Sequence, residues 1–172
     1  MNSDMQSEAI YIALGANLPS GSRTPQQTLA AALSELEARG VHCAERSSDW
    51  HSPAWPDPAD PPYVNAAARV ETELDAAALM ACLHAVEAAF GRSRTVVNAA
   101  RPLDLDIIDY KGVVDAGAAG PVLPHPRATG RAFVLLPLQE IAPGWTDPRT
   151  GRGISDLLAD LPEADTAPIY RL

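Results

Sequence analysis

A chain of 172 residues is long enough to bury a substantial core and short enough to form one domain, so we expect a single domain over 1–172. A hydrophobic content of 47%, a charged content of 20% and a net charge of −9 are typical of a globular protein and argue against a general nucleic-acid surface. No apolar run approaches the roughly 18 residues of a membrane span, and the polar start lacks the features of a secretion signal. We therefore expect a cytoplasmic protein with no membrane partner.

The first third of the chain predicts a strand, a helix and a second strand. Residues 9–14 (AIYIAL) are an apolar run typical of a buried strand. Thr24-Pro25-Gln26-Gln27 then marks a helix start, with Thr24 as the N-cap and Gln27 at the capping-box position. Gly40 ends this helix, and residues 41–51 form a weaker strand.

A proline-rich segment follows, with five prolines between Ser52 and Pro62. Such a segment cannot form a regular helix or an internal strand. It is either a stiff connector or a loop that closes over a ligand. Trp50 and Trp55 at its edge favour ligand contact, because large rings are costly to leave in water.

A third strand is expected over 63–74, and Asp75 is the N-cap of a second helix that runs to Phe90. Leucines at helical spacing give this helix its core stripe. His84 and Glu87 lie three residues apart on a neighbouring stripe. Their spacing alone is equally typical of a solvated helix edge.

The run Arg101-Pro102-Leu103-Asp104-Leu105-Asp106-Ile107 alternates apolar and acidic residues, as a strand with one buried face does. Asp104 and Asp106 then stand on the other face, roughly 7 Å apart. Two carboxylates this close repel each other unless a cation lies between them, and Mg²⁺ prefers carboxylate and phosphate oxygens. The run thus indicates a metal–nucleotide site, although an acidic solvent-facing strand would show the same spacing.

The remaining chain predicts a Gly- and Ala-rich connection, a rigid Leu123-Pro124-His125-Pro126 segment, an apolar stretch behind Arg131 and a short helix over 153–161. The predicted fold class is α+β: a ferredoxin-like β-α-β-β-α-β arrangement, with two helices on one face of an antiparallel sheet and a short C-terminal extension. This architecture hosts many functions and names none.

A series of motifs in one order resembles the 6-hydroxymethyl-7,8-dihydropterin pyrophosphokinase family. The motifs are Gly15-Ala16-Asn17, Tyr63-x-Asn65-Ala66, Gly91-Arg92-x-Arg94, Arg101-x-Leu103-Asp104-Leu105-Asp106, Pro124-His125-Pro126 and Arg131-x-Phe133-Val134-Leu135-x-Pro137-Leu138. The resemblance covers about residues 10–143 and leaves 144–172 as a tail with a short helix. It implies a folate-pathway transferase that moves diphosphate from ATP to the hydroxymethyl group of a dihydropterin and leaves AMP.

The resemblance also implies a role for particular side chains. Asp104 and Asp106 would hold two Mg²⁺ ions on the ATP triphosphate. The implied catalytic and phosphate-binding residues are Arg92, Arg94, Arg101, His125 and Arg131. The implied pterin-binding residues are Ser52, Pro53, Trp55, Tyr63, Asn65 and Phe133. The nucleotide would further contact His84, Glu87, Arg92, Arg101 and His125. The expected partners are the two small-molecule substrates, ATP and the dihydropterin, with no nucleic acid, and we expect a monomer.

Three departures from the family pattern leave the implied metal ligands and phosphate-binding arginines in place. Asn98-Ala99-Ala100 replace the tryptophan, glycine and proline that are frequent before the arginine, Ser52 replaces a threonine, and the proline-rich loop lacks the usual glycine and glutamine. None removes a metal ligand, so we expect an active enzyme. The alternatives are a catalytically silent pterin- or nucleotide-binding paralogue, a metal-dependent nucleotide phosphohydrolase, and a purely structural domain with an acidic sheet face.

Overall fold

The computed structural model describes residues 8–17, 21–91 and 102–172. A six-stranded antiparallel sheet contains β1 (Ile10–Ala16), β2 (His42–Arg46), β3 (Trp50–Ser52), β4 (Tyr63–Glu71), β5 (Asp104–Tyr110) and β6 (Tyr170–Arg171). Its order is β5-β1-β4-β3-β6, and β2 also pairs with β4. The fold class is therefore α+β, as expected, with β1 and β4 in the middle of the sheet.

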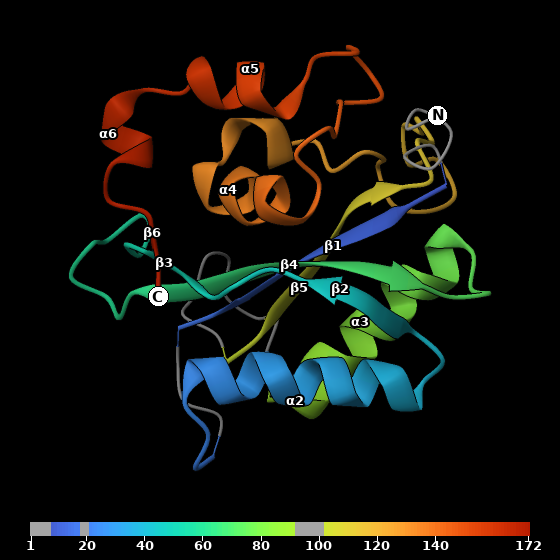
Figure 1. Ribbon diagram of the computed structural model, residues 1–172. Coiled ribbons are helices and arrows are strands. Elements are labelled where there is room, and N and C mark those ends of the chain that lie inside the picture. The colour runs from blue at the N-terminus through green and yellow to red at the C-terminus, as the bar shows by residue number, and fades with distance from the viewer. Residues whose placement is uncertain (1–7, 18–20, 92–101) are drawn as a thin grey trace.

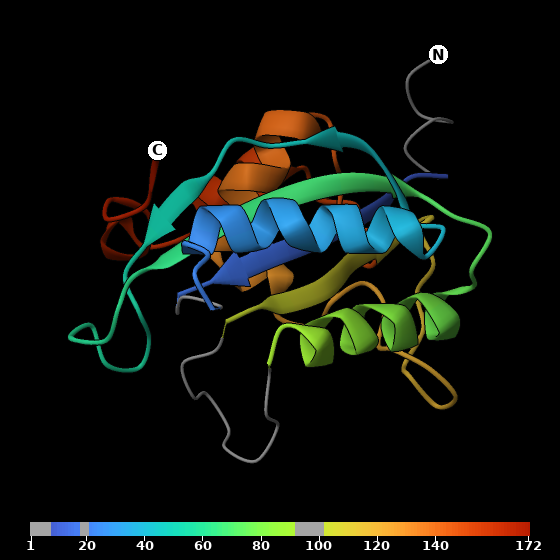
Figure 2. The same ribbon diagram turned by 90° about the horizontal axis from the view of Figure 1, so that it is seen from below.

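Helices cover both faces of the sheet (Figure 1). α2 (Pro25–Ala38) and α3 (Ala76–Ala89) lie side by side on one face, which Figure 2 views directly. α4 (Ala132–Ile141) and α5 (Ile154–Ala159) form a layer on the other face, and the short α6 (Glu163–Thr166) lies beyond them. The two helices expected on one face are α2 and α3, whereas the helical layer on the other face was not expected, because the apolar stretch after Arg131 is itself a helix.

Each face of the sheet has its own apolar core. Beneath α2 and α3, Ile12, Leu14, Leu29, Leu83 and Leu105 are among the fully or almost fully buried side chains. On the α4 face the core centres on buried Tyr11, Ile108, Leu135, Leu138 and Trp145. Burial on both faces explains why β1 reads as a continuous apolar run instead of an alternating one.

Both predicted helix starts are confirmed. The Thr24 side chain accepts a hydrogen bond from the Gln27 backbone, and the Gln27 side chain accepts one from the Thr24 backbone, which completes a capping box. The Asp75 carboxylate accepts from the Ala78 backbone N–H at 2.8 Å. These contacts satisfy N–H groups that have no partner inside the helix.

The segment predicted as one strand over 41–51 is two strands, β2 and β3, with a corner between them. Ser47 makes the corner: its backbone N–H donates to the Ala67 carbonyl, and its hydroxyl accepts from the Ala67 N–H. Glu140 of α4 holds the corner from the other side. Its carboxylate accepts from the Ser48 N–H at 3.0 Å, the Ser48 hydroxyl at 2.7 Å and the Trp50 Nε1 at 2.9 Å.

Glu140→Gln is expected to reduce stability in a pH-dependent manner. Burial alone would raise the pKa of Glu140, but the hydrogen bonds from Ser48 and Trp50 outweigh it and lower the pKa below its ordinary value of 4.5. Stability from a depressed pKa is fully present above the unfolded-state value and is lost as pH falls through the folded-state value. We expect about 1 kcal/mol of destabilisation at pH 7, given the partial exposure of the group.

Urea unfolding of wild type and Glu140→Gln at pH 7 and at pH 3.5 measures this difference. The stability gap should shrink at the lower pH. Glu163→Gln, on exposed α6, serves as the control and should show no comparable gap. A stability difference between wild type and Glu140→Gln that stays constant or grows on acidification would contradict the lowered pKa of Glu140.

Candidate functional site

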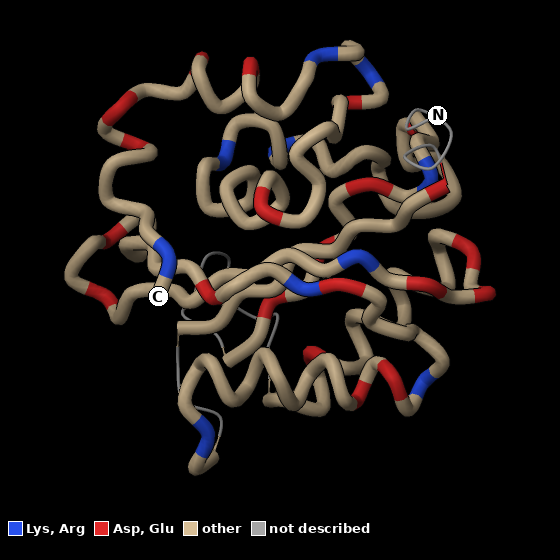
Figure 3. Tube along the Cα trace, in the orientation of Figure 1, with Lys and Arg blue, Asp and Glu red and all other residues tan. Residues whose placement is uncertain are grey.

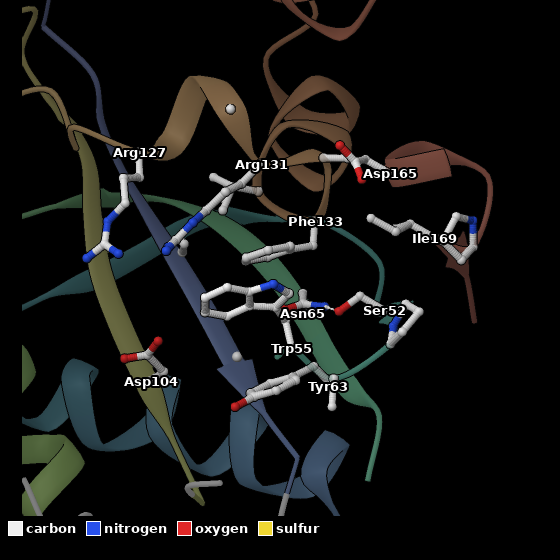
Figure 4. Close-up of a pocket in the computed structure, with 18 of the residues that line it drawn as sticks. Ser52, Trp55, Tyr63, Asn65, Asp104, Arg127, Arg131, Phe133, Asp165 and Ile169 are labelled. Carbon is white, nitrogen blue, oxygen red and sulfur yellow. Dashed lines mark hydrogen bonds between the residues drawn. The ribbon is translucent and has the colours of Figure 1, made fainter. Parts of the chain in front are cut away.

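One cavity of about 600 Å³ opens on the α4 side of the sheet. It is lined by the ends of β1 and β5, by β3, β4 and the loop between them, by residues 127–131 and the N-terminal end of α4, and by the C-terminal segment around Ile169. Figure 4 shows Asp104, Arg127 and Arg131 toward one end of the cavity, and Tyr63, Phe133 and Trp55 beside them as an aromatic group. The cavity thus has a charged end and an aromatic end.

The two aspartates of β5 both line the cavity, whereas the apolar residues that alternate with them are buried. In the antiparallel pairing with β1, Asp104 lies opposite Gly15 and Asp106 lies opposite Ala13. Because directly opposite side chains are close neighbours, small residues on β1 leave open space beside each carboxylate. The predicted alternation of this strand is confirmed.

Two carboxylates on one open strand face fit hard divalent ions such as Mg²⁺, which take oxygen ligands. Within the ranges 8–17, 21–91 and 102–172, no three His, Cys, Asp or Glu side chains are grouped so that they could hold a metal ion. Mg²⁺ held by one or two carboxylates commonly takes its other ligands from water or from substrate phosphates.

His125 stands beside the aspartate pair. Its Nε2 lies 3.7 Å from Oδ2 of Asp106, and its Nδ1 accepts a hydrogen bond from the Arg127 backbone N–H at 3.1 Å. With Nδ1 acting as an acceptor, the ring proton is on Nε2 and faces the acidic end. Burial lowers the pKa of His125, an effect that the nearby Asp106 carboxylate partly offsets. The His125 N–H donates to the Ile108 carbonyl at 2.8 Å and fixes the segment to β5.

Arg131 and Arg127 bring positive charge to the same end. Both line the cavity, and Figure 4 shows their guanidinium groups reaching into it. Arg131 immediately precedes α4, and its guanidinium lies 5.6 Å from the centre of the Phe133 ring. Elsewhere in the described chain, acidic and basic positions are interspersed over all layers (Figure 3). The cavity therefore contains two guanidinium groups, whose paired N–H donors suit phosphate oxygens, in a protein that is acidic as a whole.

The aromatic end is built on β3, β4 and α4. Asn65 and Ser52 are both buried, and Nδ2 of Asn65 donates to Oγ of Ser52 at 2.8 Å. Tyr63 and Phe133 line the same space from β4 and α4. Trp55 lines it too, yet remains 72% exposed. A flat ring bound here would meet aromatic faces and a fixed Asn–Ser pair.

Some predicted residues lie outside the described part of the chain, and others do not line this cavity. Arg92, Arg94 and Arg101, together with Asn98, Ala99 and Ala100, lie outside the described residues. His84 and Glu87 are on α3 and are not among the cavity-lining residues. Glu87 is 1% exposed, so the solvated-edge interpretation is wrong for it. Its Oε1 accepts a hydrogen bond at 2.8 Å from the N–H of Leu105, the residue between the two aspartates.

Comparison with known proteins gives a consistent result. The family model for 7,8-dihydro-6-hydroxymethylpterin-pyrophosphokinase matches residues 11–143. The chain belongs to this family. Its members are pyrophosphokinases, so the chain is a transferase of folate biosynthesis, and a silent paralogue or a phosphohydrolase is not favoured.

Individual relatives agree. The chain is 38% identical to the 2-amino-4-hydroxy-6-hydroxymethyldihydropteridine pyrophosphokinase of Synechocystis over 76% of its own length and 66% of the relative. It is 37% identical to that of Methylorubrum extorquens over 77% of its length and 82% of the relative. Among solved structures, a Plasmodium falciparum HPPK-DHPS chain matches with a TM-score of 0.68 at 12% identity, over 88% of this chain and 44% of that one. That likeness shows the fold alone.

Several cavity residues were missed from the sequence. Arg127 directly follows the Pro-His-Pro segment, and this position next to a predicted phosphate ligand was an available signal. Ala164, Asp165, Pro168 and Ile169 lie in the tail beyond the family match. No motif marks them, because only the return of the chain to β3 brings them to the cavity.

Glu87→Ala is expected to destabilise the protein by about 2 kcal/mol, because it leaves the buried N–H of Leu105 without its acceptor. Glu87→Gln keeps an acceptor oxygen and should lose clearly less. Denaturant unfolding of both variants measures the difference. An alanine variant as stable as wild type would show that the contact contributes nothing.

Proposed function

We propose that this chain transfers the β,γ-diphosphoryl unit of ATP to the hydroxymethyl group of 6-hydroxymethyl-7,8-dihydropterin, with Asp104 and Asp106 holding two Mg²⁺ ions on the triphosphate. The observation that carries the proposal is the joining of a carboxylate and arginine end to an aromatic end in one cavity. This geometry suits one polyphosphate and one flat acceptor side by side. The family and its named relatives support the same reaction.

The reaction is an in-line displacement at the β-phosphorus. The acceptor oxygen forms a bond to the β-phosphorus, the bond from that phosphorus to the α–β bridging oxygen breaks, AMP departs and the hydroxyl proton is released. Bound Mg²⁺ supplies charge neutralisation of the phosphate oxygens. Arg131 and the undescribed Arg92, Arg94 and Arg101 would add charge-assisted hydrogen bonds to phosphate. The Nε2–H of His125 would donate to a phosphate oxygen beside Asp106.

The acceptor would lie at the aromatic end. Tyr63 and Phe133 would cover the faces of its ring, and Asn65 would hydrogen-bond the amide edge while Ser52 fixes the Asn65 side chain. Pro53 and Trp55 would close the side of the β3–β4 loop. Holding both substrates in one geometry is the main source of rate in such a transfer. His84 would contact the nucleotide from α3, whereas the buried Glu87 would act indirectly by holding β5 through the Leu105 N–H.

The remaining predictions are part of the same proposal. The strand order β5-β1-β4, with β2 and β3 against β4, supports a ferredoxin-like topology. A single domain over 1–172 is supported by the return of β6 to β3. No helix within the described residues is both long and apolar enough to cross a bilayer. A cytoplasmic location, a monomeric state and the absence of a nucleic-acid partner stay predictions.

Nucleotide product analysis tests the proposal. The purified protein is incubated with ATP and Mg²⁺, with and without 6-hydroxymethyl-7,8-dihydropterin. AMP that appears only with the pterin, in equal amount to a diphosphorylated pterin, is the expected result. Phosphate release without pterin would instead establish a hydrolase, and binding of both ligands without turnover would establish a silent relative.

Asp104→Asn and Asp106→Asn are each expected to reduce AMP formation on the order of 100-fold or more, because each removes an anionic metal ligand while keeping its volume. Both side chains face the cavity, so unfolding midpoints should change little. Glu71→Gln, on the exposed end of β4, is the matched control and should keep wild-type turnover. Near-normal turnover of both aspartate variants would refute the metal assignment.

A further inference from the structure

The cavity has a wall that the family match does not include. The matched residues end at 143, whereas Ala164, Asp165, Pro168 and Ile169 of the C-terminal segment line the cavity. In Figure 4 this segment lies across from the β1 and β5 side, and the Ile169 side chain points inward toward Phe133. The remaining sides are formed by the aromatic residues and by Ser52 and Asn65.

Strand pairing fixes where Ile169 lies. β6 pairs antiparallel with β3, with Trp50 opposite Arg171 and His51 opposite Tyr170. Ile169 immediately precedes β6, and Ser52 is the last residue of β3, so both lie at the same end of this pairing. Ile169 and the buried, hydrogen-bonded Ser52–Asn65 pair line the same cavity.

The neighbours of Ile169 hold it in this orientation. The Tyr170 ring stacks on the His51 ring with centroids 4.5 Å apart, and Nδ1 of His51 is 3.4 Å from the Pro168 carbonyl oxygen. Successive side chains of a strand point to opposite faces. His51 and Tyr170 therefore pack together away from the cavity, while Ser52 and Ile169 face it. The Leu172 N–H, donating to the Asp49 carbonyl at 2.8 Å, secures the end of the chain.

We propose that Ile169 is a specificity-determining residue for the pterin acceptor, and that residues 164–169 form the outer wall of its subsite. This rests on the proposed function and adds a residue outside the family motifs. The branched apolar side chain limits the space beside Ser52 and Asn65 and contacts the edge of the bound ring. It stands on the acceptor side of the cavity, apart from Asp104 and Asp106, so it affects pterin binding and not nucleotide binding.

Ile169→Ala and Ile169→Phe in the full-length chain test this role. Truncation to alanine should raise the dissociation constant and KM for the pterin by about fivefold, from the loss of partly buried apolar contact. Phenylalanine should also weaken pterin binding, because its larger side chain would occupy space beside Ser52 and Asn65 that the pterin ring needs. For both variants, kcat and the KM for ATP should stay within about twofold of wild type, which a general structural defect would not allow.

Leu172→Ala is the matched control, since Leu172 is an exposed apolar residue of the same segment and does not line the cavity. Pterin binding is measured without ATP by calorimetry, so the result does not depend on turnover. Unchanged pterin affinity in both Ile169 variants, with an active wild type, would overturn the inference. An inactive wild type that still binds pterin would overturn the proposed function. The role of Ile169 would then be decided by the pterin affinities of the two Ile169 variants alone.

Discussion

The pairing of β1 with β5 is the constraint on which the site depends. It puts Gly15 opposite Asp104 and Ala13 opposite Asp106, so each carboxylate has open space on its inner side. Among the described strands β5 lies at the edge of the sheet, with β1 on one side and no strand of residues 8–17, 21–91 or 102–172 on the other. The carboxylate of Glu87 takes that place at one position, as the acceptor for the N–H of Leu105. The pairing with β1 and the Glu87 hydrogen bond together restrict β5, so the distance between its two aspartates can change little.

The same strand anchors the second helical layer. The pairing with β1 shifts register between Tyr11 and Ile12, which leaves Ile108 as the extra residue of a bulge on β5. Ile108 and the next residue, Asp109, are both buried, and Asp109 accepts from the Trp145 Nε1 at 2.9 Å and from the Gly112 N–H at 3.0 Å. The bulge thus lets one short strand present the two cavity-lining aspartates near one end and a buried anchor for the α4 layer at the other.

Local signals in the sequence predicted the elements that local physics determines. The capping box at Thr24, the N-cap at Asp75 and the alternation around Asp104 each depend on residues a few positions apart, and each is confirmed. The layer formed by α4 was not predicted, because Pro137 lies inside that helix and proline is typical of helix ends and interruptions. The corner at Ser47 depends on Glu140, which is 90 to 92 positions away along the chain from the residues it bonds, Trp50 and Ser48, and no local pattern reveals such a contact.

In the site, too, residues marked by local motifs were predicted, and residues placed by contacts between distant segments were not. The family motifs pointed to the aspartates and the aromatic end, which the fold brings into one cavity, and to His125, which lies beside Asp106, although their roles stay proposals. They did not reveal the wall around Ile169, since its position follows from the pairing of β6 with β3. Glu140 connects these distant parts: it holds Trp50 of β3, it lies 3.9 Å from Nη1 of Arg171 in β6, and it belongs to the same helix as Phe133. Because one carboxylate joins α4, β3 and β6, three of the surfaces around the aromatic end are set together, and a shift of any one of them changes the space left for a flat ring.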